Sequence, residues 1–253
     1  MEKQDIKSMT QEELRAFLVS LGEKPFRTAQ IYQWMHEKLA SSFDDMTNLS
    51  KVLRQKLQDA CEYVSLEKVR VQISQIDGTR KYLFRLADGN VIESVLMRYK
   101  HGNSVCISSQ VGCRMGCRFC ASTLDGLERN LRPSEMLDQI YQIQRDTGER
   151  VSNVVVMGSG EPLDNYDNLI RFIHLLTEEG GLHISQRNVT VSTCGLVPKI
   201  RELADQGLTI TLALSLHAPN DEVRKSLMPI ARTYALKAVS YTHLRAHETC
   251  ADL

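Results

Sequence analysis

The sequence predicts an α/β fold in which a small helical module and an antiparallel β segment precede a series of alternating strands and helices. Three observations predict it. Apolar residues recur at helical spacing over the first 60 residues, and they alternate with polar residues from about Glu67 to Arg98. Strand and helix patterns then alternate after residue 103, and four βα units in series imply a parallel sheet with right-handed crossovers, as an open sheet or as part of a barrel.

The N-terminal module is expected to hold three helices. Thr10 and Glu13 form a capping box ahead of the first helix, which Gly22 is expected to end. Pro25 opens the second helix, and the third runs from about residue 49 to residue 60. The spacing of the apolar residues in each segment predicts one buried face per helix.

The antiparallel segment is expected between residues 63 and 100. Asp77-Gly78 and Asp88-Gly89 mark turns between strands of alternating polarity. Glu93 interrupts an apolar strand, where a carboxylate is costly unless it is paired, exposed or used, and the residues alone favour an exposed position. The later elements are expected as strands at 104–109, 153–157, 188–193 and 208–216, and as helices at 133–147, 165–179, 197–206 and 221–227.

The composition excludes several classes of protein. The 253 residues are 42% hydrophobic and 25% charged, which is ordinary for a globular chain and excludes disorder and a small disulfide scaffold. No apolar stretch is long enough for a membrane span, and the first residues lack the apolar core of a signal peptide, so we expect a cytoplasmic protein. The 31 basic residues balance 31 acidic ones, so net charge does not indicate a nucleic-acid partner.

Three of the seven cysteines fall within eight residues, as Cys113, Cys117 and Cys120 in a C-x3-C-x2-C arrangement. Three thiolates can hold three irons of a 4Fe-4S cluster and leave the fourth iron open to a small molecule. A zinc site is the alternative, but zinc prefers four ligands, and His101, a possible fourth ligand, lies on the far side of the adjoining strand. The cysteine triplet therefore favours an iron–sulfur site.

The ends of the next three predicted strands carry residues suited to a ligand site. In parallel α/β folds, ligands bind at the carboxyl ends of strands. Together with the cysteine loop, four successive strand ends therefore describe one site. The three further ends read Gly158-Ser159-Gly160-Glu161-Pro162, Ser192-Thr193-Cys194-Gly195 and Ser215-Leu216-His217-Ala218-Pro219.

These motifs resemble the radical S-adenosylmethionine (SAM) superfamily, and more narrowly the dual-specificity rRNA/tRNA adenine-C2 methyltransferases, the RlmN branch of the RlmN/Cfr group. Phe119 before the last cysteine of the triplet is typical of the superfamily motif. The resemblance extends from the N-terminal helices through about Val239, and it includes the segments 24–27, 43–49, 106–113, 191–195 and 215–221. It implies a partial (βα) radical-SAM barrel, incomplete at the C-terminus.

The resemblance also implies the roles of individual residues. Cys113, Cys117 and Cys120 would bind the cluster, Glu93 would be the acid/base carboxylate, and Cys106 would resolve the covalent RNA intermediate by forming a disulfide. The SAM contacts would come from the strand ends, at Gly160, Glu161, Ser192, Ser215, Leu216 and His217. The family uses two SAM molecules per turnover, one to methylate a cysteine and one to generate the radical that activates this methyl group.

The partners implied are 23S rRNA, tRNA and an electron donor of the flavodoxin or ferredoxin type, with no membrane and a monomeric chain. Six Lys/Arg against two acids between Arg98 and Arg132 could form a basic rim for phosphate, or could be scattered surface charge. The domains expected are an RNA-contacting helical domain at 1–62, the antiparallel segment at 63–100, the radical SAM core at 101–239 and a tail at 240–253.

Three alternatives remain open from the sequence. A C8-methylating relative shares the fold and cofactors, a zinc-stabilised RNA-binding fragment would lack activity, and a non-catalytic paralogue would retain only the fold. The tail after Val239 resembles nothing in the family, and the neighbours of Cys250 do not match the motif of the methyl-carrying cysteine. We therefore expect the methyl carrier to be missing from this chain, which would bind the cluster and SAM without completing turnover.

Overall fold

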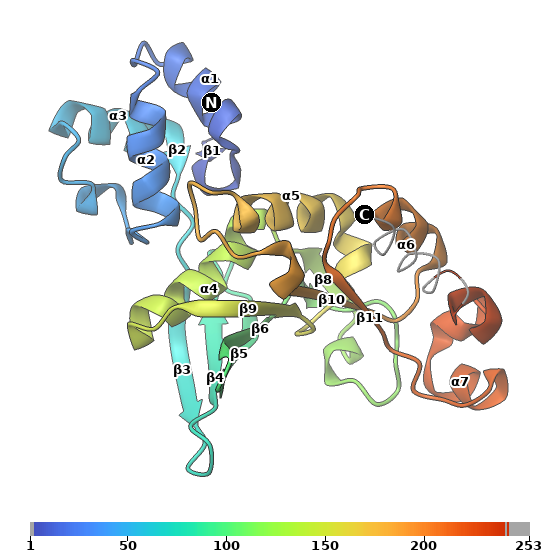
Figure 1. Ribbon diagram of the computed structural model, residues 1–253. Helices are drawn as coiled ribbons and strands as arrows, with labels where there is room; N and C mark the ends of the chain where they lie inside the picture. Colours follow the sequence, from blue (N-terminus) through green and yellow to red (C-terminus); the bar gives the residue numbers. More distant parts are fainter. Residues whose placement is uncertain (1–2, 241, 243–253) are drawn as a thin grey trace.

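The computed structural model describes residues 3–240 and Thr242 (Figure 1). The expected tail lies almost entirely outside the described residues, Cys250 included. Among the described residues, no helix is both long and apolar enough to cross a membrane.

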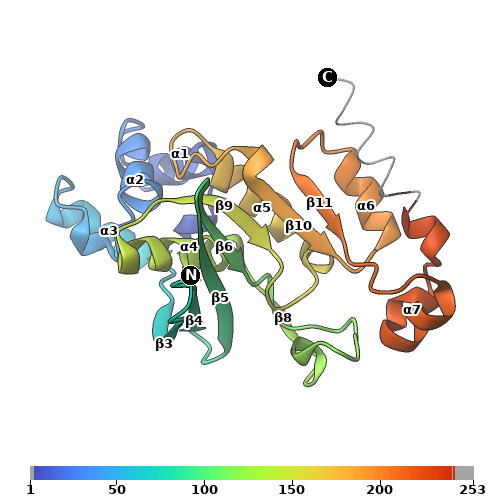
Figure 2. The ribbon, with the colours of Figure 1, turned by 60° about the horizontal axis from the view of Figure 1, so that its bottom comes forward.

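A mixed seven-stranded sheet forms the centre of the molecule, with the strand order β11-β10-β9-β6-β5-β4-β3 (Figures 1 and 2). β6, β9, β10 and β11 are parallel, whereas β3, β4, β5 and β6 are antiparallel. The seven strands are β3 (Glu67–Ile73), β4 (Arg80–Arg85), β5 (Val91–Tyr99), β6 (Gly102–Ile107), β9 (Val151–Val156), β10 (Val189–Thr193) and β11 (Thr211–Leu214). The expected α/β fold with an unclosed, partial barrel is confirmed, and β6 is the strand that joins its antiparallel and parallel parts.

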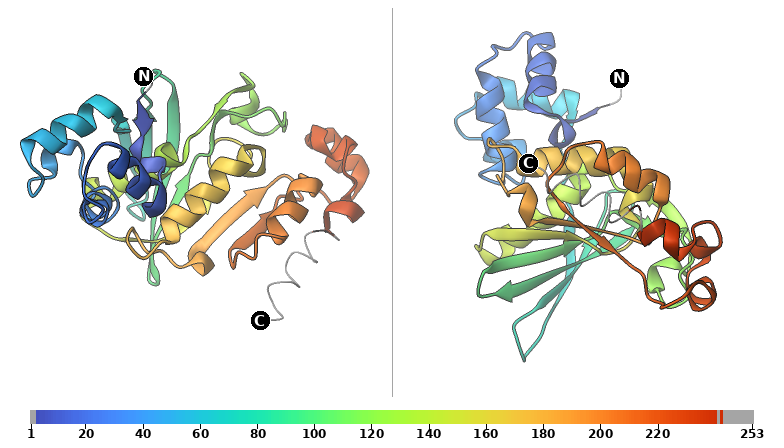
Figure 3. Two further views of the ribbon diagram at one scale, coloured as in Figure 1. Left: turned by 90° about the horizontal axis from the view of Figure 1, so that it is seen from above. Right: turned by 45° about the vertical axis from the view of Figure 1, so that its right-hand side comes forward.

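Helices cover one face of this sheet, as the view from above in Figure 3 shows. Tyr82, Ile92 and Val105 come from neighbouring strands and are almost fully buried in the same core as Leu137 of α4. The covering helices are α4 (Pro133–Thr147), α5 (Tyr166–Thr177) and α6 (Val197–Ala204), whereas α7 (Asp221–Leu227) lies to the side and contacts the cysteine loop. Alternate strand residues point to the opposite face, where side chains are more exposed.

The N-terminal module packs on α4 and α5 (Figure 1). Its helices are α1 (Gln11–Ser20), α2 (Arg27–His36) and α3 (Lys51–Ala60). The capping box of Thr10 and Glu13 is confirmed. Pro25 lies in a turn before α2, which therefore begins two residues later than the sequence indicates.

Two short strand pairs escaped the sequence analysis. β1 (Gln4–Asp5) pairs with β2 (Cys61–Glu62), so that the beginning and end of the helical module are held together. β7 (Gln110–Gly112) pairs with β8 (Leu127–Asn130), and this ladder closes the cysteine-containing loop. The strand expected at 208–216 is shorter, because only Thr211–Leu214 pairs with β10.

Candidate active site

One pocket of about 280 Å³ lies where the carboxyl ends of β9, β10 and β11 meet the cysteine loop. Eight of the eleven site residues expected from the sequence line it. Three are the clustered cysteines, and the other five come from the strand ends. The eight are Cys113, Cys117, Cys120, Gly160, Glu161, Ser192, Ser215 and His217.

The β7–β8 ladder shapes the cysteine loop. The Cys113 N–H donates to the Gly126 carbonyl at 2.8 Å, which draws the two ends of the loop together. Gly112 has φ +72°, and a Cβ atom there would lie 2.0 Å from the Gly126 oxygen, so only glycine fits. Within the loop, the Thr123 hydroxyl donates to the carbonyls of Cys117 and Cys120. The three cysteines are thereby fixed on one side of the pocket.

The three thiols suit a cluster that neutralises them. Cys113 and Cys117 are buried, and Cys120 is half-buried. Burial, with a smaller contribution from the negative charges of Glu161 and the neighbouring thiolates, raises the pKa of Cys113 to about 11. Iron ions would remove this penalty, because a coordinating thiol is deprotonated outright. The donor set of three cysteines from one loop therefore fits a 4Fe-4S cluster with one open iron.

The fourth zinc ligand considered from the sequence does not reach the cysteine loop. His101 lies before β6, at the opposite end of that strand from the cysteine loop, and its ring stacks on Tyr99 with centroids 5.2 Å apart. No three His, Cys, Asp or Glu side chains of the described residues are arranged to hold a single metal ion.

Glu161 is a buried carboxylate in the pocket wall, with only 4% of its surface exposed. Its oxygens accept hydrogen bonds from the backbone N–H groups of Cys194 at 2.8 Å and Leu163 at 3.2 Å. Burial raises the pKa of Glu161, and these hydrogen bonds oppose the increase. None of its described neighbours is an ion-pair partner, so the site suits a ligand that brings an ammonium group, such as the amino-acid part of SAM.

Polar groups at the ends of β10 and β11 form the opposite side of the pocket. The hydroxyl oxygens of Ser192 and Ser215 are 3.4 Å apart. His217 adopts φ +54° and its ring packs on Phe119 of the cysteine loop, with centroids 4.7 Å apart. Leu216 is exposed beside this wall and does not line the pocket. These contacts place the polar strand ends next to the cysteine loop.

Glu93 and Cys106 lie on adjacent strands rather than in the pocket. Cys106 pairs with Val95 in the β5–β6 register, so Glu93 is its diagonal neighbour. The Ser108 hydroxyl donates to the Glu93 carbonyl at 2.7 Å and accepts from the Ser159 N–H at 3.0 Å, which links this strand to the pocket wall. The expectation of an exposed Glu93 is confirmed, and its carboxylate also forms an ion pair with Lys81 at 2.6 Å.

Comparisons with known proteins agree with this geometry. Residues 4–63 match the ribosomal RNA large subunit methyltransferase N-terminal domain, and residues 107–248 match the radical SAM superfamily. A probable dual-specificity RNA methyltransferase RlmN from Lachnospira eligens is 72% identical over 235 residues, which are 93% of this chain and 67% of that protein. The chain belongs to the RlmN family of radical SAM RNA methyltransferases.

Two further relatives support the assignment to the RlmN family. A second probable dual-specificity RNA methyltransferase RlmN, from Lachnoclostridium phytofermentans, is 64% identical over 94% of this chain and 67% of that protein. The crystal structure of a radical SAM methyltransferase from Sphaerobacter thermophilus superposes with a TM-score of 0.92 at 40% identity, covering 98% of this chain and 74% of that one. RlmN-family enzymes use a 4Fe-4S cluster and SAM.

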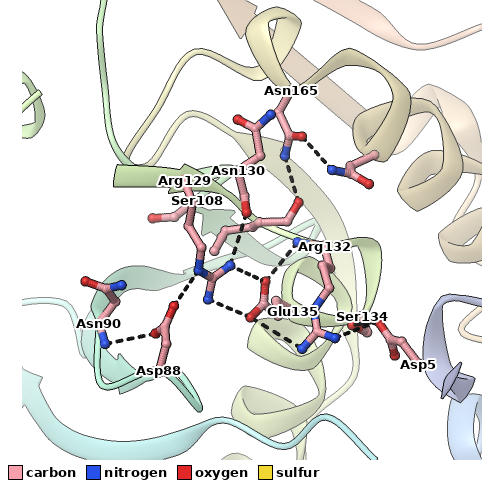
Figure 4. Close-up of polar contacts among 12 residues, drawn as sticks. Asp5, Asp88, Asn90, Ser108, Arg129, Asn130, Arg132, Ser134, Glu135 and Asn165 are labelled. Carbon is pink, nitrogen blue, oxygen red and sulfur yellow. Dashed lines mark hydrogen bonds and ion pairs between the residues drawn. The ribbon is translucent and has the colours of Figure 1, made fainter. Parts of the chain in front are cut away.

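Most of the basic side chains between Arg98 and Arg132, which could form a rim for phosphate or be scattered surface charge, are neutralised by carboxylates. Arg129 lies between Asp88 and Glu135, and Arg132 also faces Glu135 (Figure 4). Carboxylates likewise pair with Arg98 and Arg114. Four of the six basic side chains thus hold the fold together, and Arg118 remains exposed on the cysteine loop.

The sequence analysis missed two groups around the pocket of this RlmN-family chain. A third residue, Cys194, belongs to a strand end that the sequence placed at the site, and it lines the pocket. Gln110 donates to Asp164 at 3.0 Å and accepts from the Glu161 N–H at 2.8 Å, so it orients the β9 exit. Arg224 lies fully buried behind the pocket, and no signal in the sequence separates it from the exposed basic residues of a short helix.

Proposed function

We propose that this chain carries the cluster and SAM site of a radical SAM enzyme that methylates C2 of a specific adenine in 23S rRNA and in tRNA. The observation that carries the proposal is the shared pocket, in which three thiols of one loop face a buried carboxylate that has no cationic partner among the described residues. The relatives' name, dual-specificity RNA methyltransferase, supplies the class of substrate.

Cys113, Cys117 and Cys120 would hold the cluster, and the strand ends would hold SAM. The cluster and SAM, when bound, supply the one-electron chemistry that methylation of an unreactive ring carbon requires. Glu161 would accept the SAM ammonium, and Gly160 and Ser192 would contact the same amino-acid part of SAM. A Cβ atom at Gly160 would lie 2.5 Å from the Gln110 side chain, so this position needs glycine. Ser215, Leu216 and His217 would contact the rest of SAM.

Glu93 would act on the adenine as the base that removes the C2 proton. Its half-exposed carboxylate lies on the open face of β5, where the adenine of an RNA could approach it, and an ion pair with Lys81 holds the carboxylate in place. Cys106 lies diagonally across from Glu93 and would resolve the covalent RNA intermediate through its thiol. Burial raises the pKa of Cys106, and a hydrogen bond with the Met157 backbone lowers it.

The partners would be 23S rRNA and tRNA, contacted in part by residues 1–62, and an electron donor of the flavodoxin or ferredoxin type. The chain would act as a monomer in the cytoplasm. Residues 101–239 would form the radical SAM core, following the antiparallel segment at 63–100.

Anaerobic reconstitution tests the proposal. The chain, loaded with iron and sulfide, is incubated with SAM, dithionite and RNA, and the nucleosides of the RNA are separated. We expect iron and sulfide together, SAM cleavage to 5′-deoxyadenosine, and loss of both in Cys120→Ala but not in the matched control Cys61→Ala, whose thiol is buried away from the pocket. Zinc alone would contradict the cluster, and C8-methyladenosine would contradict the C2 assignment.

A further inference from the structure

Arg224 is the bulkiest of the fully buried side chains in the described structure, with none of its surface exposed. Its guanidinium donates to three backbone carbonyls, those of Cys194 at 2.6 Å, Leu216 at 3.3 Å and Tyr234 at 3.4 Å. No carboxylate of the described residues forms an ion pair with it. A buried ion is usually paired or coordinated, because burial removes its hydration. Arg224 is therefore a positive charge whose counter-charge the described chain does not supply.

Arg224 lies close to the cysteine loop, because the end of its helix packs against that loop. Met228, one turn further along, packs against Cys117 and Cys194 in a small apolar cluster. The Arg118 N–H donates to the Leu227 carbonyl at 2.9 Å, so the end of α7 contacts the loop directly. The red α7 and the green loop lie side by side in Figures 2 and 3.

Glu161 and Arg224 hold the same residue from two sides. Glu161 accepts from the Cys194 N–H at 2.8 Å, and Arg224 donates to the Cys194 carbonyl at 2.6 Å. The two buried charges are separated by this residue and do not pair with each other. Glu161 thus remains available to an ammonium ligand on one side, and Arg224 remains available to negative charge on the other.

We propose that Arg224 is the buried counter-charge of the cysteine-ligated cluster and raises its reduction potential, while its three hydrogen bonds position the strand ends around the pocket. This inference rests on the cluster assignment under the proposed function. Three thiolates bring more negative charge than the iron–sulfur core neutralises, and uptake of one electron from an external low-potential reductant adds another. No bond forms or breaks, and no proton is needed. A fixed positive charge nearby favours the reduced, more negative state.

The test is a potentiometric titration of the reconstituted chain, with electron paramagnetic resonance as the readout of the reduced cluster. Arg224→Gln removes the charge, and Arg224→Lys keeps it but lacks the three separate donor nitrogens with which the guanidinium reaches the three carbonyls. Lys225→Gln is the matched control, because it removes the same charge from the exposed side of α7. We expect Arg224→Gln to make reduction at least tenfold less favourable, which is about 59 mV for one electron. Arg224→Lys and Lys225→Gln are expected to keep the wild-type midpoint.

The variants separate the charge from the hydrogen bonds. A wild-type midpoint in Arg224→Gln, or an equal decrease in Arg224→Lys, would overturn the proposal. If Arg224→Gln binds no cluster, its midpoint potential cannot be measured, and Arg224→Lys becomes the variant that tests the proposal. A cluster at the wild-type midpoint in Arg224→Lys supports the counter-charge, and failure of this variant too shows that the hydrogen bonds alone matter. A wild-type chain that takes up no iron and sulfide would instead contradict the proposed function.

Discussion

A buried ion pair joins the helical module to the core, and its removal gives a stability test with a predicted asymmetry. Lys7 and Asp138 are both fully buried, with the Lys7 Nζ atom 2.9 Å from the Asp138 Oδ1 atom. Lys7 also donates to the Val64 carbonyl, and its ammonium lies 4.1 Å from the centre of the Tyr63 ring. Burial lowers the pKa of Lys7, with Asp138 opposing the decrease. The ammonium therefore depends on this one carboxylate for its charge.

Asp138 has more hydrogen-bond and ion-pair partners than Lys7, so the two substitutions should lower the unfolding free energy by different amounts. Asp138 also accepts from the Leu66 N–H at 2.7 Å and pairs with Arg145 at 3.3 Å. Asp138→Asn leaves the Lys7 ammonium buried without a counter-ion and should cost about 3–5 kcal/mol of unfolding free energy. Lys7→Met leaves Asp138 with its remaining donors and should cost about 1.5–3 kcal/mol.

Urea unfolding followed by circular dichroism measures both costs at constant m-value. Lys199→Met is the control, because its pair with Glu202 is largely exposed and should contribute at most about 1 kcal/mol. The double variant should cost less than the sum of the single ones, since the two side chains contact each other. A cost for Asp138→Asn equal to or below that of Lys7→Met would refute the reasoning.

Three further predictions concern pH, the cysteine loop and SAM. Burial lowers the pKa of His36 to about 3, so below about pH 6.5 the unfolded chain binds a proton that the folded chain does not. The unfolding free energy should therefore fall by about 2 kcal/mol from pH 7 to pH 5. An equal decrease in His36→Gln would contradict this assignment. Gly112→Ala should destabilise the chain and lower its iron content more than Gly126→Ala. A Cβ atom at Gly112 would lie 2.0 Å from the Gly126 oxygen, whereas a Cβ atom at Gly126 meets nothing within 4 Å. Equal unfolding midpoints of the two variants would disprove the clash. Glu161→Gln should weaken SAM binding about 10- to 150-fold by calorimetry, whereas unchanged affinity would remove Glu161 from the site.

Local signals predicted most of the elements, because their causes lie within a few residues. α4 spans Pro133–Thr147, as expected from the sequence, and Gly148 follows it in the left-handed conformation. The β1–β2 and β7–β8 pairs have only two to four residues per strand, too few for an alternating pattern, and they form through tertiary contact. Ion pairs such as Lys7–Asp138 join positions 131 residues apart, and no local pattern specifies them.

The pocket was predictable for a related reason, since the topology of a parallel sheet brings successive strand ends together. Arg224 was not, because its role depends on three carbonyls from other segments. The roles of Glu93 and Cys106 came only from family resemblance. Alternation indicates that Glu93 faces away from the helices, and only the register of β5 against β6 places it diagonally across from Cys106.

The mixed sheet places residues of its antiparallel part close to the pocket formed by its parallel part. β6 pairs with β5 in the antiparallel direction and with β9 in the parallel direction. Cys106 is therefore opposite Val95 on one side and Val155 on the other, two residues before the β9 exit that leads to Glu161. A slip of one residue in either register would turn Cys106 toward the helices. The position of Cys106 beside the pocket thus depends on the two registers of a single strand, whose Val105 and Ile107 side chains are buried in the helix-covered core.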